Sequence, residues 1–222
     1  MNDNKADFAL GLLVREQLLH LGVETPFIPQ GAIPYEDRYN KIKGHFKGVL
    51  DALGMDLTDD SICETPDRMA KMYLQELYAG LDYANFPKCT VVDNKFKYDE
   101  MLLERRIKVH SNCEHHGVSF LGFAHVAYIP KSKVLGLSKL NRIVDFFARR
   151  PQIQERLTEQ IFHALSFILE TDNIAICIEA EHMCVKTRGI RDGCSDTVTS
   201  KLGGAFKDKP AVRAEFFALV KL

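Results

Sequence analysis

The sequence lacks long apolar runs, a strong net charge and tryptophan. Hydrophobic residues make up 46% of the 222 residues, enough for a sizeable core, yet no apolar run approaches the roughly 18 residues of a membrane-spanning helix. The first residues lack the basic and apolar regions of a secretory signal, so we expect a cytoplasmic protein. The net charge of -1 argues against nucleic-acid binding by bulk electrostatics, and any anion site must be a local cluster of Lys and Arg.

The cysteines also lack a Cys-x-x-Cys pair. In a reducing compartment the six cysteines are expected to be thiols, some of them metal ligands, rather than a disulfide framework. Cys177 lies inside an isoleucine run and is interpreted as core filling. No role is predicted for Cys63, Cys89 or Cys194.

Hydrophobic periodicity predicts an α+β protein. The expected helices have apolar residues three and four positions apart, at 6–21, 35–53, 65–78, 138–147, 151–170 and from 211 onward. The expected strands, rich in apolar residues, are 105–111, 118–128, 174–185 and 197–200. Gly117 is expected to join the first two strands as a hairpin, and Thr65 and Ser138 are predicted N-caps. We therefore expect an N-terminal helical region at 1–95, followed by a β-β-α-α-β-β domain at 96–222.

Two distant segments carry residues that bind metal ions. Cys113 and His116 are separated by two residues at the expected end of a strand, a spacing at which one turn can close on an ion. Cys184 joins them only if two strands lie close together. Thiolate and imidazole ligands suit zinc, and three protein ligands are typical of a catalytic zinc with an open fourth position. The alternative is that His115 and His116 are surface residues of a turn.

Two further histidines adjoin these ligands. A free imidazole titrates near neutral pH, so a histidine at position 115 or 182 could exchange protons with a substrate. The sequence equally allows each of them only to orient a ligand by a hydrogen bond.

Basic residues form separate pairs that could bind an anion. They are Arg68 with Lys71, Lys139 with Arg142, and Lys186 with Arg188. Ser138, at an expected helix start, adds free amide N–H groups that favour anions, and planar guanidinium groups suit phosphate oxygens. Each pair could also be an ordinary solvated face.

Several sequence blocks resemble GTP cyclohydrolase I. The resemblance spans about residues 35–206, and its blocks are 64–71, 80–83, 113–116, 136–144, 150–158 and 182–190. It implies a tunnelling fold that converts GTP and water to formate and 7,8-dihydroneopterin triphosphate, at the start of folate and tetrahydropterin biosynthesis. It also implies one zinc ion per subunit and a homodecamer of two pentamers, with active sites at subunit junctions. Two alternatives are another tunnelling-fold enzyme and a zinc-stabilised oligomeric binding module without activity.

The resemblance further implies a role for individual residues. Cys113, His116 and Cys184 would bind zinc, whose activated water attacks C8 of guanine. His115 and His182 would be the acid/base pair, with Ser138 acting at the sugar. The expected substrate-binding residues are Glu155 and Gln154 at the guanine, and Leu137, Ser138, Lys139, Arg142, Arg188, Arg68 and Lys71 around the ribose and triphosphate. Glu155 also has a plain structural interpretation, because a carboxylate near the start of a helix complements the helix dipole.

Overall fold

The computed structural model describes residues 5–27 and 33–221, and these fall into two compact units. One unit comprises Met1–Thr25 with Gly80–Leu222, and the other comprises Pro26–Ala79. The units are divided at residues other than the expected boundary at 95/96, and α1 (Phe8–His20) packs against α5 (Gln154–Leu169) within the larger unit. Among the described residues, no helix is long and apolar enough to cross a membrane.

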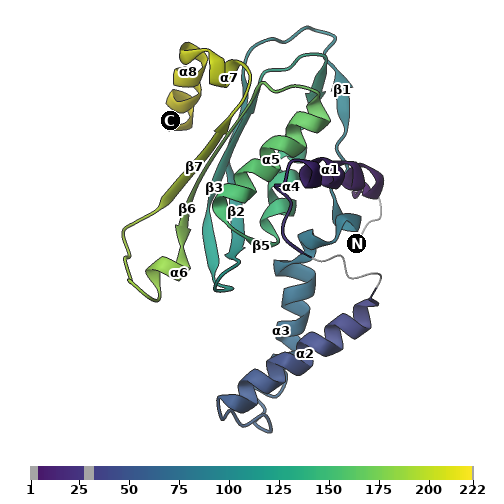
Figure 1. The fold of residues 1–222 in the computed structure, drawn as a ribbon, viewed down its shortest axis with the longest axis vertical. Helices are drawn as coiled ribbons and strands as arrows, with labels where there is room; N and C mark the ends of the chain where they lie inside the picture. The colour runs from purple at the N-terminus through teal and green to yellow at the C-terminus, as the bar shows by residue number, and fades with distance from the viewer. Residues whose placement is uncertain (1–4, 28–32, 222) are drawn as a thin grey trace. The chain divides into compact units, whose positions relative to one another are not determined.

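The larger unit is built on a five-stranded sheet with the strand order β5-β2-β3-β6-β7 (Figure 1). Its strands are β2 (Leu102–Cys113), β3 (Ser119–Tyr128), β5 (Pro151–Gln152), β6 (Ile174–His182) and β7 (Thr197–Leu202). A separate two-stranded sheet pairs β1 (Val91–Asp93) with β4 (Lys133–Leu135). All neighbours in the large sheet are antiparallel except β5, which runs parallel to β2. The predicted hairpin is confirmed, and the last two strands of the sheet, β6 and β7, also pair with each other.

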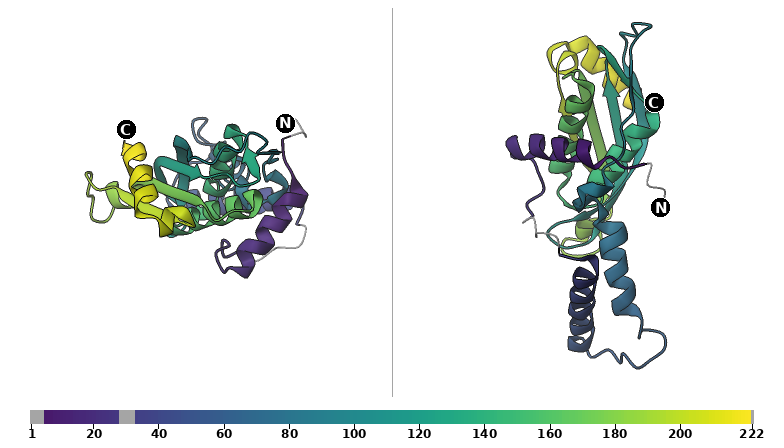
Figure 2. Two further views of the ribbon diagram at one scale, coloured as in Figure 1. Left: turned by 90° about the horizontal axis from the view of Figure 1, so that it is seen from above. Right: turned by 90° about the vertical axis from the view of Figure 1, so that its right-hand side faces the viewer.

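Helices cover both faces of the sheet (Figures 1 and 2). The helices of this unit are α1, α4 (Leu137–Ala148), α5 (Gln154–Leu169), α6 (Met183–Lys186), α7 (Ala205–Asp208) and α8 (Pro210–Lys221), with short 3-10 turns at Ala79–Leu81 and Tyr83–Asn85. Alternate residues of β6 point to opposite faces. Accordingly, Ile176 and Ile178 join the main core under α4 and α5, whereas Ala175 and Cys177 join a smaller core under α7 and α8.

The smaller unit is helical. It contains α2 (Tyr35–Ala52), α3 (Thr65–Met72) and a π-helical turn, η1 (Tyr73–Leu77). Thr65 was predicted as the N-cap, but it is the first helical residue and Glu64 occupies the cap. Pro66 still lies in the first turn of α3. Backbone N–H groups in a first turn have no partner within the helix, so a residue without an N–H group loses no helical hydrogen bond there.

Three expected boundaries in the larger unit are wrong. Gly136, not Ser138, is the N-cap of α4, since Gly136 takes the extended conformation before the helix. The helix expected from Pro151 begins at Gln154, because residues 151–152 form β5 beside the end of β2. The strand expected to continue to 185 ends at His182, and Cys184 lies on the short helix α6.

Candidate functional site

The predicted ligands Cys113, His116 and Cys184 converge at one end of the large sheet. Cys113 ends β2, and His116 lies in the turn that follows, which is closed by a 2.9 Å hydrogen bond from the Gly117 N–H to the Cys113 carbonyl. Cys184 follows β6, which lies beside β3 and therefore ends near the same turn. One ligand atom from each of the three residues lies within 4.8 Å of the other two. The predicted convergence is confirmed.

The chemistry of this cluster fits a zinc ion. Cys113 is buried, Cys184 half-buried and His116 exposed, so the cluster opens toward solvent on the imidazole side. Burial, followed by the neighbouring Cys113 thiol, raises the pKa of Cys184. Among the described residues the cluster has three members, and sulfur and nitrogen ligands with a free position are typical of catalytic zinc.

His182, at the end of β6, is held by two neighbours. Its Nε2 lies 2.8 Å from Gln154 Oε1, and its ring stacks on Phe120 with the centroids 4.7 Å apart. Burial lowers the pKa of His182, and the carboxylate of Glu155 partly opposes that shift. The acid/base candidate is thus half-buried, oriented, and close to the start of α5.

Gln154 is buried and its amide is fully engaged. Its Nε2 donates to the carbonyl oxygens of Ile178 and Thr197, both at 3.0 Å, and lies 3.2 Å from Thr199 Oγ1. The amide oxygen must therefore be the atom that faces His182, so the imidazole donates from Nε2. The Nδ1 atom of a neutral His182 is consequently left as the proton acceptor.

The other predicted residues at this end of the sheet are exposed. Glu155 follows Gln154 in the first turn of α5 and is exposed to solvent. His115 is exposed, with its Nδ1 atom 3.7 Å from Cys113 Sγ. Arg188 is exposed just after α6, and its charge acts on Cys184. The exposed groups provide a carboxylate, an imidazole and a guanidinium near the candidate metal centre.

The predicted residues on α4 lie at the opposite end of the same sheet. Leu137 and Ser138 are exposed in the first turn of α4, with Lys139 and Arg142 half-buried behind them. Asn141, beside Arg142, donates a 3.2 Å hydrogen bond to Glu104 near the start of β2, whereas Cys113 ends that strand. At about 3.3 Å per residue, the separation along β2 is roughly 30 Å. Within one chain, the α4 residues do not join the metal cluster.

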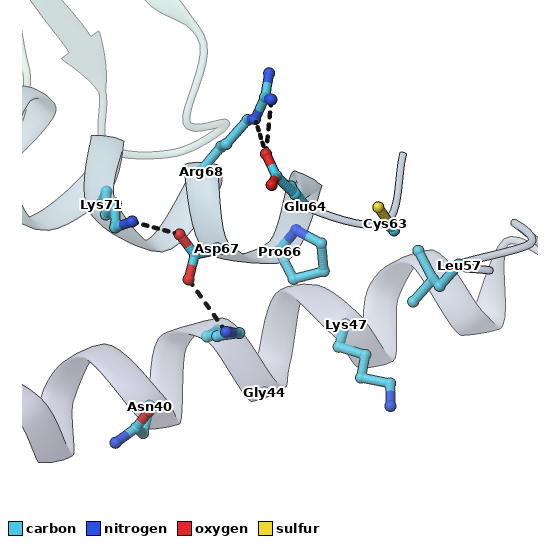
Figure 3. A pocket seen from close by; sticks show the side chains of 11 residues that line it. Asn40, Gly44, Lys47, Leu57, Cys63, Glu64, Pro66, Asp67, Arg68 and Lys71 are labelled. Carbon is cyan, nitrogen blue, oxygen red and sulfur yellow. Dashed lines mark hydrogen bonds and ion pairs between the residues drawn. The ribbon is translucent and has the colours of Figure 1, made fainter. Parts of the chain in front are cut away.

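Arg68 and Lys71 line a pocket of about 830 Å³ that belongs entirely to the smaller unit (Figure 3). Arg68 contacts Glu64 at 2.7 Å, and Lys71 contacts Asp67 at 2.6 Å. Hydrogen bonds from Lys71, Tyr39 and Lys43 hold the pKa of Asp67 well below its usual range. Both predicted phosphate ligands are thus exposed cations paired with carboxylates.

One feature of the site was not predicted from the sequence. Arg156, in α5, donates to both carboxylate oxygens of Glu114, which lies between Cys113 and His115. The sequence showed only an acidic residue within the segment 113–116 and an arginine within the block 150–158. No local pattern indicates that the two residues meet.

The chain is similar to known proteins over most of its length. Residues 42–221 match the family model of GTP cyclohydrolase I. The chain is 55% identical to the GTP cyclohydrolase 1 of Aeromonas hydrophila subsp. hydrophila over 210 residues, which cover 95% of this chain and 96% of the relative. It is 55% identical to that of Vibrio cholerae serotype O1, covering 92% and 94%, and 54% identical to that of Photobacterium profundum, covering 93% and 94%. The chain therefore belongs to the GTP cyclohydrolase I family.

Proposed function

We propose that this protein converts GTP and water to formate and 7,8-dihydroneopterin triphosphate, using a zinc ion held by Cys113, His116 and Cys184. The observation that carries the proposal is the convergence of these three ligand atoms within 4.8 Å in a chain of this family. A bound zinc ion would supply a Lewis acid and make water nucleophilic at neutral pH. Such a nucleophile is what attack at C8 of guanine requires.

His182 is the proposed proton carrier at the purine. C8 becomes electrophilic when N7 is protonated, and an imidazole of near-neutral pKa can deliver that proton. Gln154 fixes the Nε2–H of His182, so protonation and deprotonation occur at Nδ1. His115, whose Nδ1 atom lies 3.7 Å from the Sγ atom of the ligand Cys113, is the proposed second acid/base group. Ser138 is proposed to act at the sugar.

Glu155 is the proposed guanine-binding carboxylate. An exposed carboxylate at the start of α5 can accept hydrogen bonds from guanine N1–H and the 2-amino group together, a donor pair that adenine does not offer there. Gln154 was expected to share this role. Because its amide is buried and bonded to β6, β7 and His182, we propose instead that Gln154 positions His182 and the adjacent Glu155.

The ribose and triphosphate are proposed to bind residues, most of them basic, that are supplied by more than one subunit. The separation of roughly 30 Å along β2 means that Ser138, Lys139 and Arg142 of one chain cannot reach a nucleotide at that chain's own Cys113. Arg188 lies beside the metal cluster, and Leu137, Arg68 and Lys71 complete the proposed set. A site at a subunit junction would bring these groups together.

The edges of the sheet support an oligomer. In the described part of the chain, β7 pairs on one side only, and β2 pairs with β5 only at Asn112 and Cys113. Unpaired strand edges at both sides of a sheet are templates for pairing with another chain. We propose that subunits continue the sheet into a ring, as in the decamer that the family resemblance implies.

The test is to replace one ligand while following both metal and product. Cys113→Ser is expected to lose zinc, measured by elemental analysis, and to abolish formate release, while keeping the circular dichroism spectrum of the parent. Cys194→Ser, which changes an exposed thiol in the described structure, is the matched control and should keep both properties. Full turnover by metal-free Cys113→Ser protein would refute the proposed zinc role.

A further inference from the structure

The turn that carries two of the candidate ligands is tied to α5 by a two-point ion pair. Arg156 Nη1 lies 2.6 Å from Glu114 Oε2, and Nη2 lies 3.2 Å from Oε1. The two side chains are 16% and 23% exposed, so water screens the pair less than it screens a surface pair. Because Nη1 and Nη2 of the planar guanidinium both face the same carboxylate, the pair fixes the orientation of the Glu114 side chain as well as its distance from Arg156.

The ligand turn needs such a restraint. Backbone hydrogen bonds hold its two ends, since Glu114 N donates to the Gln152 carbonyl at 2.9 Å and Gly117 N donates to the Cys113 carbonyl at 2.9 Å. The imidazoles of His115 and His116 are exposed, so core packing does not fix them. The Glu114 side chain therefore provides a link from this turn to a helix.

The helix at the other end of the ion pair carries the rest of the proposed site. Gln154, which bonds to His182, and the exposed Glu155 immediately precede Arg156 in the first turn of α5. One helical turn thus contacts the acid/base histidine, presents the proposed guanine carboxylate and restrains the metal-binding turn. A shift of the ligand turn would separate groups that must act on one nucleotide.

We propose that Glu114 and Arg156 form a positioning pair that sets Cys113 and His116 at zinc-binding distance from Cys184. This inference rests on the proposed function, because it presupposes that the three residues hold zinc. Neither residue of the pair is proposed to touch the metal or the substrate. Loss of outer groups that orient metal ligands typically lowers metal affinity by about 10- to 100-fold.

A role of charge alone and a positioning role predict opposite changes in zinc affinity for Arg156→Ala. If the pair acted only through its charges, Arg156→Ala would remove a nearby positive charge and strengthen binding of a divalent cation, while Glu114→Gln would weaken it. If the pair positions the turn, both variants lose affinity. The reversed pair, Glu114→Arg with Arg156→Glu, restores the link with opposite polarity and should recover much of the affinity lost by either single variant.

The experiment measures the zinc dissociation constant by competition with a chromophoric chelator, and the absorption spectrum with Co²⁺ alone. The full chain is used, and thermal unfolding of each metal-free variant reports folding. Lys201→Ala is the matched control, because it breaks the 3.0 Å ion pair between Lys201 and Glu159, which joins the same helix to β7 away from the ligand turn. The control should bind zinc as the parent does.

The positioning role predicts a loss of about 10- to 100-fold in zinc affinity for both single variants, altered Co²⁺ spectra, and recovery in the reversed pair. It is overturned if Arg156→Ala binds zinc as tightly as the parent or more tightly, or if the reversed pair folds and stays as weak as the single variants. A parent protein that binds no zinc, or a Cys113→Ser variant that binds it equally well, would instead refute the proposed metal site.

Discussion

The buried ion pair between Glu24 and Arg150 offers the sharpest stability prediction. Arg150 is fully buried, and its Nη1 lies 2.6 Å from Glu24 Oε1. The guanidinium carbon lies 4.8–4.9 Å from the ring centroids of Tyr83, Phe146 and Phe147. This arrangement fastens the segment after α1 to the residues that lead into β5.

Removing the carboxylate should be costly. Glu24→Ala leaves a buried guanidinium without its counter-charge, and breaking a buried ion pair from one side destabilises by about 3–5 kcal/mol. For a protein of this size each kcal/mol corresponds to about 2–4 °C in melting temperature, so the drop should be roughly 6–20 °C. Asp145→Ala breaks an exposed ion pair with the neighbouring Arg149, whose side chain is 44% exposed, and should lower stability by about 1 kcal/mol or less.

Thermal unfolding followed by circular dichroism measures both variants. Hydrogen exchange adds a local readout, because the loss of Glu24 should speed exchange in α1 more than in β3. The double variant Glu24→Leu with Arg150→Met removes both charges, and should recover part of the loss because no buried charge remains unpaired. Equal melting temperatures for Glu24→Ala and Asp145→Ala would refute the reasoning.

Two further predictions concern the sheet. Gly122→Ala should strongly lower the melting temperature, because the added Cβ would lie 1.9 Å from the Glu179 carbonyl oxygen and force β3 away from β6. Gly136→Ala is the control, because its Cβ would have its nearest neighbour at 3.8 Å. Similar melting temperatures for the two variants would contradict the argument. Burial lowers the pKa of His125 in the folded protein, so as the pH falls this histidine is protonated in the unfolded chain before it is protonated in the folded one. Stability against urea should therefore decline from about pH 7 to about pH 5.5, and His125→Gln should flatten this decline; an unchanged slope would contradict it.

Local patterns in the sequence determined much of the framework. The stripe Leu157, Ile161, Leu165 and Ile168 marks the buried face of α5, because apolar spacing along a helix directly reports which side faces a core. Gly117 indicates the hairpin that brings β2 and β3 together. These features depend on residues close in the chain, so each can be recognised without knowing its neighbours in space.

The candidate site depended partly on the same kind of information. Thiol and imidazole side chains limit the chemistry, so Cys113, His116 and Cys184 could be proposed as ligands before their distances were known. Their convergence required the pairing of β2 with β3, which the hairpin pattern predicted, and of β3 with β6, which no local pattern predicted.

Tertiary structure alone decided what surrounds these residues. The pattern placed Pro151 in a helix, but pairing with β2 draws residues 151–152 into the sheet and moves the helix start to Gln154. That start places the Gln154 amide between His182 and two strand carbonyls, and directs Arg156 at Glu114. The sequence alone does not distinguish a polar side chain that faces water from one that faces a buried partner, because strand register and helix position determine the partner.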